Sequence, residues 1–113
     1  MTFGHMAQQT RKSATIFGVR FRQARLRAGL SQKEVGVLAG IDEFVASSRI
    51  NQYERGVHTP DHATACKLAR VLRVPAAFLY SDDDRIAELL LAVAHLTSHQ
   101  IRQLAHRLTA QVS

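Results

Sequence analysis

The segment from Arg25 to Pro60 constrains the fold of this chain more than any other part of it. Gly29 ends one amphipathic run, Ser31 is placed to cap a short helix, and Gly40 separates that helix from a further run at helical spacing. The last run is polar on one side and ends before Gly56. Two short helices joined by a tight turn predict a helix-turn-helix, whose second helix has the size and shape to enter the major groove of DNA.

Charge is distributed unevenly along the 113 residues. Through Arg73 there are 12 Lys and Arg against 5 Asp and Glu, and from Val74 onward there are 3 against 4. A basic front half beside a nearly neutral back half indicates that the front half meets a polyanion.

Composition favours one soluble, mostly helical protein. Apolar residues make up 46% of the chain, with only 2 Pro and a single cysteine, Cys66. No apolar run is long enough to span a bilayer, and residues 1–14 lack the apolar centre of a secretory signal. We therefore expect a cytoplasmic protein with no membrane association.

Helical spacing of apolar residues predicts seven helices and no strand. Their approximate ranges are 16–28, 32–39, 43–55, 62–72, 75–79, 85–96 and 98–108. In the second helix, Val35, Leu38 and Ala39 are expected to face inward. Gly36 lies in the middle of the same helix, and we expect it to let the third helix cross closely.

The third helix has two possible starts. Ser47 can cap it, but Asp42 is favoured because Ile41 and Ala46 then occupy the two positions of a hydrophobic staple. With that start, Ala46, Ile50 and Tyr53 share the inner face, and the polar side chains from Ser47 to Gln52 face outward.

An ordered set of residues over more than half of the chain resembles a known family. The set comprises Arg22, Arg25, Gly29-Leu30-Ser31-Gln32, Val35, Leu38-Ala39-Gly40-Ile41, Ile50, Glu54-Arg55-Gly56, Pro60, Leu68-Ala69, Leu72, Val74 and Leu79. Residues 16–80 thus resemble the Cro/CI-type helix-turn-helix domain, the xenobiotic-response-element family of transcriptional regulators. The resemblance implies an all-α fold, with a five-helix DNA-binding domain over 15–80. We expect a flexible arm at 1–14 before this domain and two C-terminal helices at 81–113 after it.

The resemblance also implies roles for individual residues. The positions that contact bases in the family fall on Ser47, Ser48, Arg49, Asn51 and Gln52. These side chains suit the task, since Asn and Gln can bond an adenine edge and Arg pairs best with guanine. The phosphate-contacting positions are expected at Gln32, Arg22, Arg55, His58 and Thr59. Arg20 is the alternative to Arg22 in the first helix, and Arg25 with Glu54 resembles a structural ion pair that links the first helix to the third.

The chain departs from the family in length. Between Ile41 and Glu54 the family has about four fewer residues, close to one helical turn. Either the third helix begins one turn early or the connecting turn is longer. An early start would bring Glu43 and Val45 near the groove.

The two C-terminal helices carry more apolar surface than a small DNA-binding domain needs. The residues concerned are Ile86, Leu89, Leu90, Val93, Leu96, Ile101, Leu104 and Leu108. We expect them to form a homodimer that reads a palindromic site, with two half-sites one DNA turn apart. The alternative is that both helices fold back on the same chain as a monomer.

The resulting expectation is a transcriptional regulator of double-stranded DNA, acting as a repressor. The alternative left open is the antitoxin of a toxin–antitoxin pair, whose C-terminal helices bind a protein partner. No nucleophile lies beside a base and no loop is suited to hold a phosphate, so we expect neither an enzyme nor a cofactor. His95, His99 and His106 lack companions at ligand spacing, and no metal site is expected.

Overall fold

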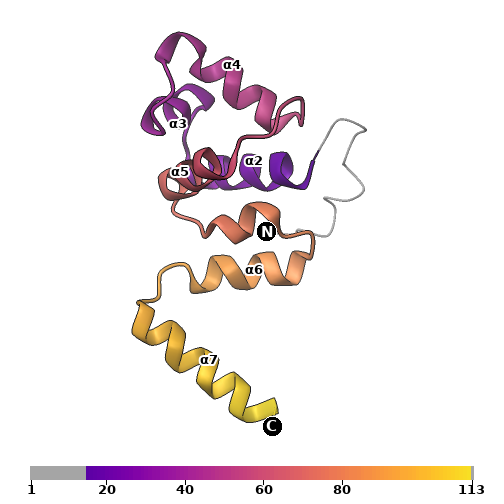
Figure 1. Ribbon diagram of the computed structural model, residues 1–113, viewed down its shortest axis with the longest axis vertical. Helices are drawn as coiled ribbons and strands as arrows, with labels where there is room; N and C mark the ends of the chain where they lie inside the picture. Colours follow the sequence, from indigo (N-terminus) through magenta and orange to yellow (C-terminus); the bar gives the residue numbers. More distant parts are fainter. Residues whose placement is uncertain (1–14, 113) are drawn as a thin grey trace.

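The structure is a computed structural model that describes residues 15–112, and over this range it contains helices and no strand (Figure 1). The elements are α2 (Ile16–Ala28), α3 (Gln32–Leu38), α4 (Glu43–Glu54), α5 (His62–Leu72), the 3₁₀ helix η1 (Ala76–Tyr80), α6 (Asp84–Val93) and α7 (Ser98–Val112). The predicted all-α fold is confirmed. The arm expected at 1–14 lies outside the described residues.

Side-chain caps begin the helices where the sequence predicted. Ser31 and Glu34 form a reciprocal capping box: the Glu34 backbone N–H donates to Ser31 Oγ at 3.0 Å, and the Ser31 N–H donates to Glu34 Oε1 at 2.8 Å. The Asp42 carboxylate accepts from the Phe44 N–H at 2.8 Å. The third helix of the prediction, α4, therefore starts after Asp42 and not at Ser47.

Two helix ends differ from the expectation by more than two residues. α6 begins at Asp84 and stops at Val93, three residues before the predicted end, and α7 continues to Val112. Thr97 and Gln100 form a capping box before α7: the Thr97 N–H donates to Gln100 Oε1, and the Gln100 N–H donates to Thr97 Oγ1. Because this cap starts a new helix direction, the residues before it form a turn instead of extending α6.

Leu38 was predicted to face inward, and this is wrong. Its side chain is 63% exposed, whereas Val35 is fully buried and Ala39 is partly buried against the core. In a helix of two turns the inner face passes from Val35 to the residue four positions later, so the residue three positions later is rotated toward solvent.

The core lies between α2, α5 and η1, with contributions from α3, α4 and α6. Its largest fully buried apolar side chains are Phe21, Phe78, Ile50, Leu68, Leu79 and Val35. α6 joins the core through Ala87 and Leu91, but α7 has no buried residue and extends away from the rest of the described chain (Figure 1). No helix within residues 15–112 is long and apolar enough to cross a membrane.

Arg20 is buried inside the molecule, so it is not the phosphate-contacting alternative to Arg22. Its Nε donates to the Ser81 carbonyl at 2.7 Å, its Nη2 lies 3.1 Å from Asp84 Oδ1, and its guanidinium stands 5.7 Å from the centre of the Phe78 ring. Position 20 is three residues after Phe17 and four before Ala24, so it shares a helix face with these two buried residues. The side chain therefore attaches α2 to the start of α6.

Candidate nucleic-acid interface

Two glycines let the backbone of α4 approach its neighbours closely. A Cβ at Gly36 of α3 would lie 2.7 Å from the Ala46 Cβ, and a Cβ at Gly18 of α2 would lie 2.5 Å from the Glu54 carbonyl oxygen. Side-chain carbon atoms do not approach other atoms this closely, so any residue larger than glycine at these positions would push α4 away. The close crossing expected at Gly36 is present, whereas the one at Gly18 was missed because nothing in the local sequence identifies its partner.

This packing leaves one side of α4 outside the body. Ala46, Ile50 and Tyr53 are buried, which confirms the predicted inner face. The residues predicted to contact bases lie on the remaining surface: Ser47, Ser48 and Arg49 are exposed, and Asn51 and Gln52 are partly exposed. Their contacts with bases stay a prediction, but their positions leave them accessible to a ligand outside the body.

The structure brings Arg25 and Glu54 together as a buried ion pair. The Nη2 of Arg25 donates to Glu54 Oε1 at 3.0 Å, and its Nε donates to Oε2. The third arm of the guanidinium, Nη1, donates to the Leu30 carbonyl at 3.0 Å. Both side chains are nearly inaccessible, with 11% exposure for Arg25 and 3% for Glu54. A bidentate contact between a guanidinium and a carboxylate fixes the angle between α2 and the end of α4.

Gln32 extends this network, although it was predicted to contact phosphate. Its Nε2 donates to Glu54 Oε1 and to Asn51 Oδ1, both at 3.2 Å. The hydrogen bond to Asn51 orients that amide and leaves its Nδ2 group for another acceptor. Arg22 lies at the edge of the network, with Nε 3.9 Å from Glu54 Oε1 and 61% of its side chain exposed.

A cleft of about 310 Å³ joins α4 to the loop that follows it. It is lined by Arg49, Gln52, Tyr53, His58 and Thr59. The loop is held against α4 because the backbone N–H groups of residues 57 and 58 donate to the Gln52 carbonyl. Two predicted base-contacting residues and two predicted phosphate-contacting residues therefore line one depression. Arg55 is exposed beside it.

Phe44 is the most unusual surface residue of α4, and the sequence reasoning did not single it out. It is 89% exposed and lies one turn before Ser48 on the same helix face. Its neighbour Val45 is 42% exposed. The signal was the additional length expected between Ile41 and Glu54, and α4 begins at Glu43, which is the earlier of the two starts considered.

Titratable residues elsewhere form no metal centre within residues 15–112. The Cys66 Sγ lies 3.5 Å from His62 Nε2, a contact between successive turns of α5. His95, His99 and His106 all lie at exposed positions.

Comparisons with known proteins identify a helix-turn-helix domain in the region that contains α3 and α4. The family model for a helix-turn-helix domain matches residues 16–78, which span α2 to η1. Among solved structures, the chain is similar to the crystal structure of transcriptional regulator BswR, with 48% sequence identity and a TM-score of 0.74. That match covers 82% of this chain and 92% of the BswR chain. No curated protein sequence is significantly similar to the chain.

Proposed function

The chain belongs to the helix-turn-helix domain family of DNA-binding transcriptional regulators, and we propose that it is a repressor that binds a palindromic operator as a homodimer. It acts in the cytoplasm, by occupying DNA and not by catalysis. In this proposal, residues 15–80 form the DNA-binding domain, and residues 81–113 form the dimerisation extension.

The main observation in favour of sequence-specific DNA binding is the exposed polar side of α4. In the proposal, Ser47, Ser48, Arg49, Asn51 and Gln52 contact base edges in the major groove. The phosphate contacts come from Arg22, Gln32, Arg55, His58 and Thr59. The extra turn at Phe44 extends the same face, and an exposed phenyl ring suits the methyl group of thymine.

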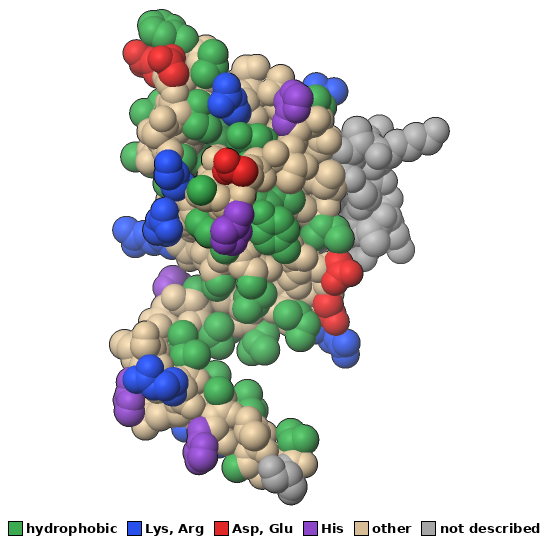
Figure 2. Space-filling view, viewed as in Figure 1, with side chains coloured by type: hydrophobic (Ala, Val, Ile, Leu, Met, Phe, Trp, Pro, Cys, Tyr) green, Lys and Arg blue, Asp and Glu red, His purple; other side chains and the backbone are tan. Residues whose placement is uncertain are grey.

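Exposed apolar side chains on α6 and α7 support the homodimer. Ile86 and Leu89 on α6 are 48% and 49% exposed, and Ile101 and Leu108 on α7 are 44% and 47% exposed. Figure 2 shows apolar side chains on the surfaces of both helices. The remaining residues of the predicted interface, namely Leu90, Val93, Leu96 and Leu104, are partly buried.

The opposite side of α6 packs on the core through Ala87 and Leu91, so the outer side needs another cover. A second copy of the same face would cover it with two-fold symmetry, and a palindromic operator then requires the two α4 helices to lie about 34 Å apart, one DNA turn.

A protein partner on the same face is the second candidate function, as in an antitoxin. The observation in its favour is again the apolar surface of α6 and α7. Sedimentation separates the two candidates, because a dimer covers this surface by itself and a chain that stays monomeric leaves it for another protein.

Selection of bound sequences from a random duplex pool tests the proposal. We expect enrichment of a palindrome, and we expect Gln52→Ala to relax the sequence preference with a small loss of non-specific affinity. Arg55→Gln is the matched comparison, because the Arg55 side chain makes no hydrogen bond or ion pair within residues 15–112. It should weaken binding to all sequences alike. It should also reduce the number of ions released on DNA binding by about one, which is measured as a shallower slope of log affinity against log salt concentration.

Gln32→Ala is also expected to weaken all DNA similarly, but it removes the hydrogen bonds to Glu54 and Asn51 as well. If Gln52→Ala and Arg55→Gln changed affinity equally on every sequence, the assignment of base reading to α4 would be wrong. If the pool gave no enriched sequence, specific DNA recognition itself would be excluded.

A further inference from the structure

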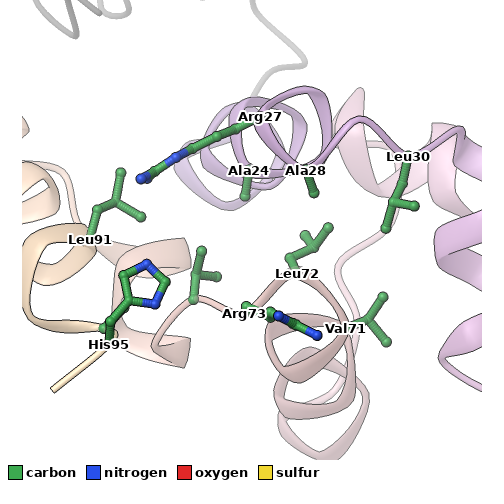
Figure 3. A pocket seen from close by; sticks show the side chains of 11 residues that line it. Ala24, Arg27, Ala28, Leu30, Val71, Leu72, Arg73, Leu91 and His95 are labelled. Carbon is green, nitrogen blue, oxygen red and sulfur yellow. The ribbon is translucent and has the colours of Figure 1, made fainter.

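A pocket of about 420 Å³ lies where the C-terminal ends of α2, α5 and α6 converge, away from the exposed side of α4 (Figure 3). Its inner wall is apolar and includes the buried residues Ala24, Leu72 and Leu91. The volume is within the range of about 300–1,000 Å³ that small-molecule sites occupy. The wall and the volume together suit a compact apolar group.

The rim of the pocket is cationic. The guanidinium groups of Arg27 and Arg73 line it beside the imidazole of His95, and no acidic residue among the described ones does. Neither guanidinium has a hydrogen-bond or ion-pair partner within residues 15–112. Figure 3 shows the Arg27 side chain extending from α2 toward Leu91 and His95, with Arg73 on the other side of the pocket. Positive charge over an apolar wall is complementary to an anion with an apolar body.

Arg73 also has an unusual backbone. Its φ of 58° is the only positive value at a non-glycine position among the described residues. At the C-terminal cap of α5, where Arg73 lies, glycine is the usual residue because it adopts this conformation without strain. The chain instead places a long cationic side chain there, at the edge of the pocket.

We propose that this pocket binds a small organic anion that carries one carboxylate on a compact apolar group. The carboxylate is bound by Arg27 beside His95, and the apolar group packs against Ala24, Leu72 and Leu91. Arg73 adds positive charge from the opposite side. Such a ligand contacts both the proposed DNA-binding domain and α6, so its binding would link this domain to the C-terminal helices.

The test uses the full chain and the probe 2-naphthoate, with the neutral 2-naphthalenemethanol as its isosteric control. In an NMR titration we expect saturable amide shifts confined to the ends of α2, α5 and α6. We expect naphthoate to bind at least about tenfold more tightly than the alcohol, because only naphthoate makes charge-assisted hydrogen bonds. Equal affinity for the two probes, absence of shifts, or shifts centred on the outer faces of α6 and α7 would each overturn the proposal.

Matched variants locate the site. Arg27→Gln should lower naphthoate affinity at least about tenfold. Arg70→Gln is the control, because Arg70 also lies in the last turn of a helix, where a cation interacts with the helix dipole, but it does not line the pocket. Equal losses in both variants would show a general charge effect and contradict the assignment.

A third variant fills the space without removing charge. Ala28 lines the pocket and is exposed, so Ala28→Phe is compatible with folding and should abolish naphthoate binding. Undiminished binding by Ala28→Phe would place the probe elsewhere and overturn the proposal. No DNA is present in these experiments, so their outcome is independent of whether the operator proposal holds.

Discussion

At the scale of single residues, the Glu54 carboxylate accepts hydrogen bonds from Arg25 on α2 and from Gln32 on α3, while its own backbone belongs to α4. A carboxylate that is 3% exposed requires such partners, because burial of an unpaired charge is unfavourable by several kcal/mol. Three helices of the helix-turn-helix domain are thus connected through one side chain. The same network orients Asn51, which lies on the side of α4 proposed to face DNA.

Arg25→Gln should lower the free energy of unfolding by about 3–5 kcal/mol, because it leaves the Glu54 carboxylate buried without its cation. Arg22→Gln is the matched control: Arg22 is 61% exposed and 3.9 Å from the same carboxylate, so a loss of at most about 1 kcal/mol is expected. Urea unfolding followed by circular dichroism measures both values. A loss for Arg25→Gln no larger than that for Arg22→Gln would contradict the structural role of the pair.

Asp61 leads to a prediction about the stability of the folded protein at acidic pH. Hydrogen bonds from the Thr64 side chain and backbone hold the pKa of the Asp61 carboxyl below its usual range. A group whose pKa is lower in the folded state contributes stability above its unfolded value of about 3.9, and this contribution is lost as the pH falls through the lower folded value.

Asp61→Asn keeps a good capping side chain but does not titrate. We therefore expect the variant to match the wild type near pH 7 and to lose less stability between about pH 4 and pH 2. Urea midpoints over that range provide the measurement. Parallel curves for the two proteins would show that Asp61 contributes nothing to the acid sensitivity.

At the scale of elements, the placement of α4 depends on close backbone contact more than on side-chain packing. Gly18 and Gly36 touch opposite ends of it, and only Ala46, Ile50 and Tyr53 of its apolar residues are buried. A helix that buries so little apolar surface is positioned by these contacts and by the ion pair at its end.

Gly18→Ala should therefore displace α4, since the added Cβ meets the Glu54 carbonyl oxygen, which is backbone and cannot rotate away. We expect a loss of about 1–3 kcal/mol in stability together with weaker DNA binding. Gly29→Ala is the control, because its Cβ meets nothing within 4 Å and the cost comes only from the φ of +72°. It should lose about 1–2 kcal/mol and retain the affinity of the folded protein for DNA. Unchanged DNA affinity in folded Gly18→Ala would argue against this mechanism.

At the scale of the whole molecule, the described chain consists of a packed body and a terminal helix without buried residues. An amphipathic helix in that position gains little stability from its own chain, so it is expected to pack against a second molecule. The proposed dimer assigns that role to the exposed faces of α6 and α7.

The double variant Leu89→Glu and Ile101→Glu should convert the dimer to a monomer without unfolding it, because both side chains are nearly half exposed in the single chain. Sedimentation equilibrium at tens of micromolar protein gives the mass, and circular dichroism verifies the fold. Val37→Glu is the control, since Val37 is 44% exposed but lies on α3. A wild-type protein that sediments as a monomer would exclude the homodimer.

The sequence by itself determined the helices and most of their caps. Ser31, Asp42 and Asp61 each bond a backbone N–H two or three residues later, so the signal and its partner lie within one helical turn. The buried side of α4 was likewise predicted from its spacing, because helical geometry alone determines which residues share a face. The proposal that the exposed side of α4 contacts bases came from the residues that the chain shares with the family.

Only the tertiary structure decided which residues meet across long separations. Arg20 bonds Ser81 and Asp84, more than sixty positions away, and Gln32 bonds Asn51 on another helix. The pocket between α2, α5 and α6 also forms only when distant segments pack together. Local rules describe consecutive residues, whereas these contacts depend on the angles and distances at which whole helices pack. Helical spacing alone did not separate the other basic residues of α2: folding buries Arg20 and leaves Arg27 at the pocket rim, whereas the pairing of Arg25 with Glu54 was already implied by the family resemblance.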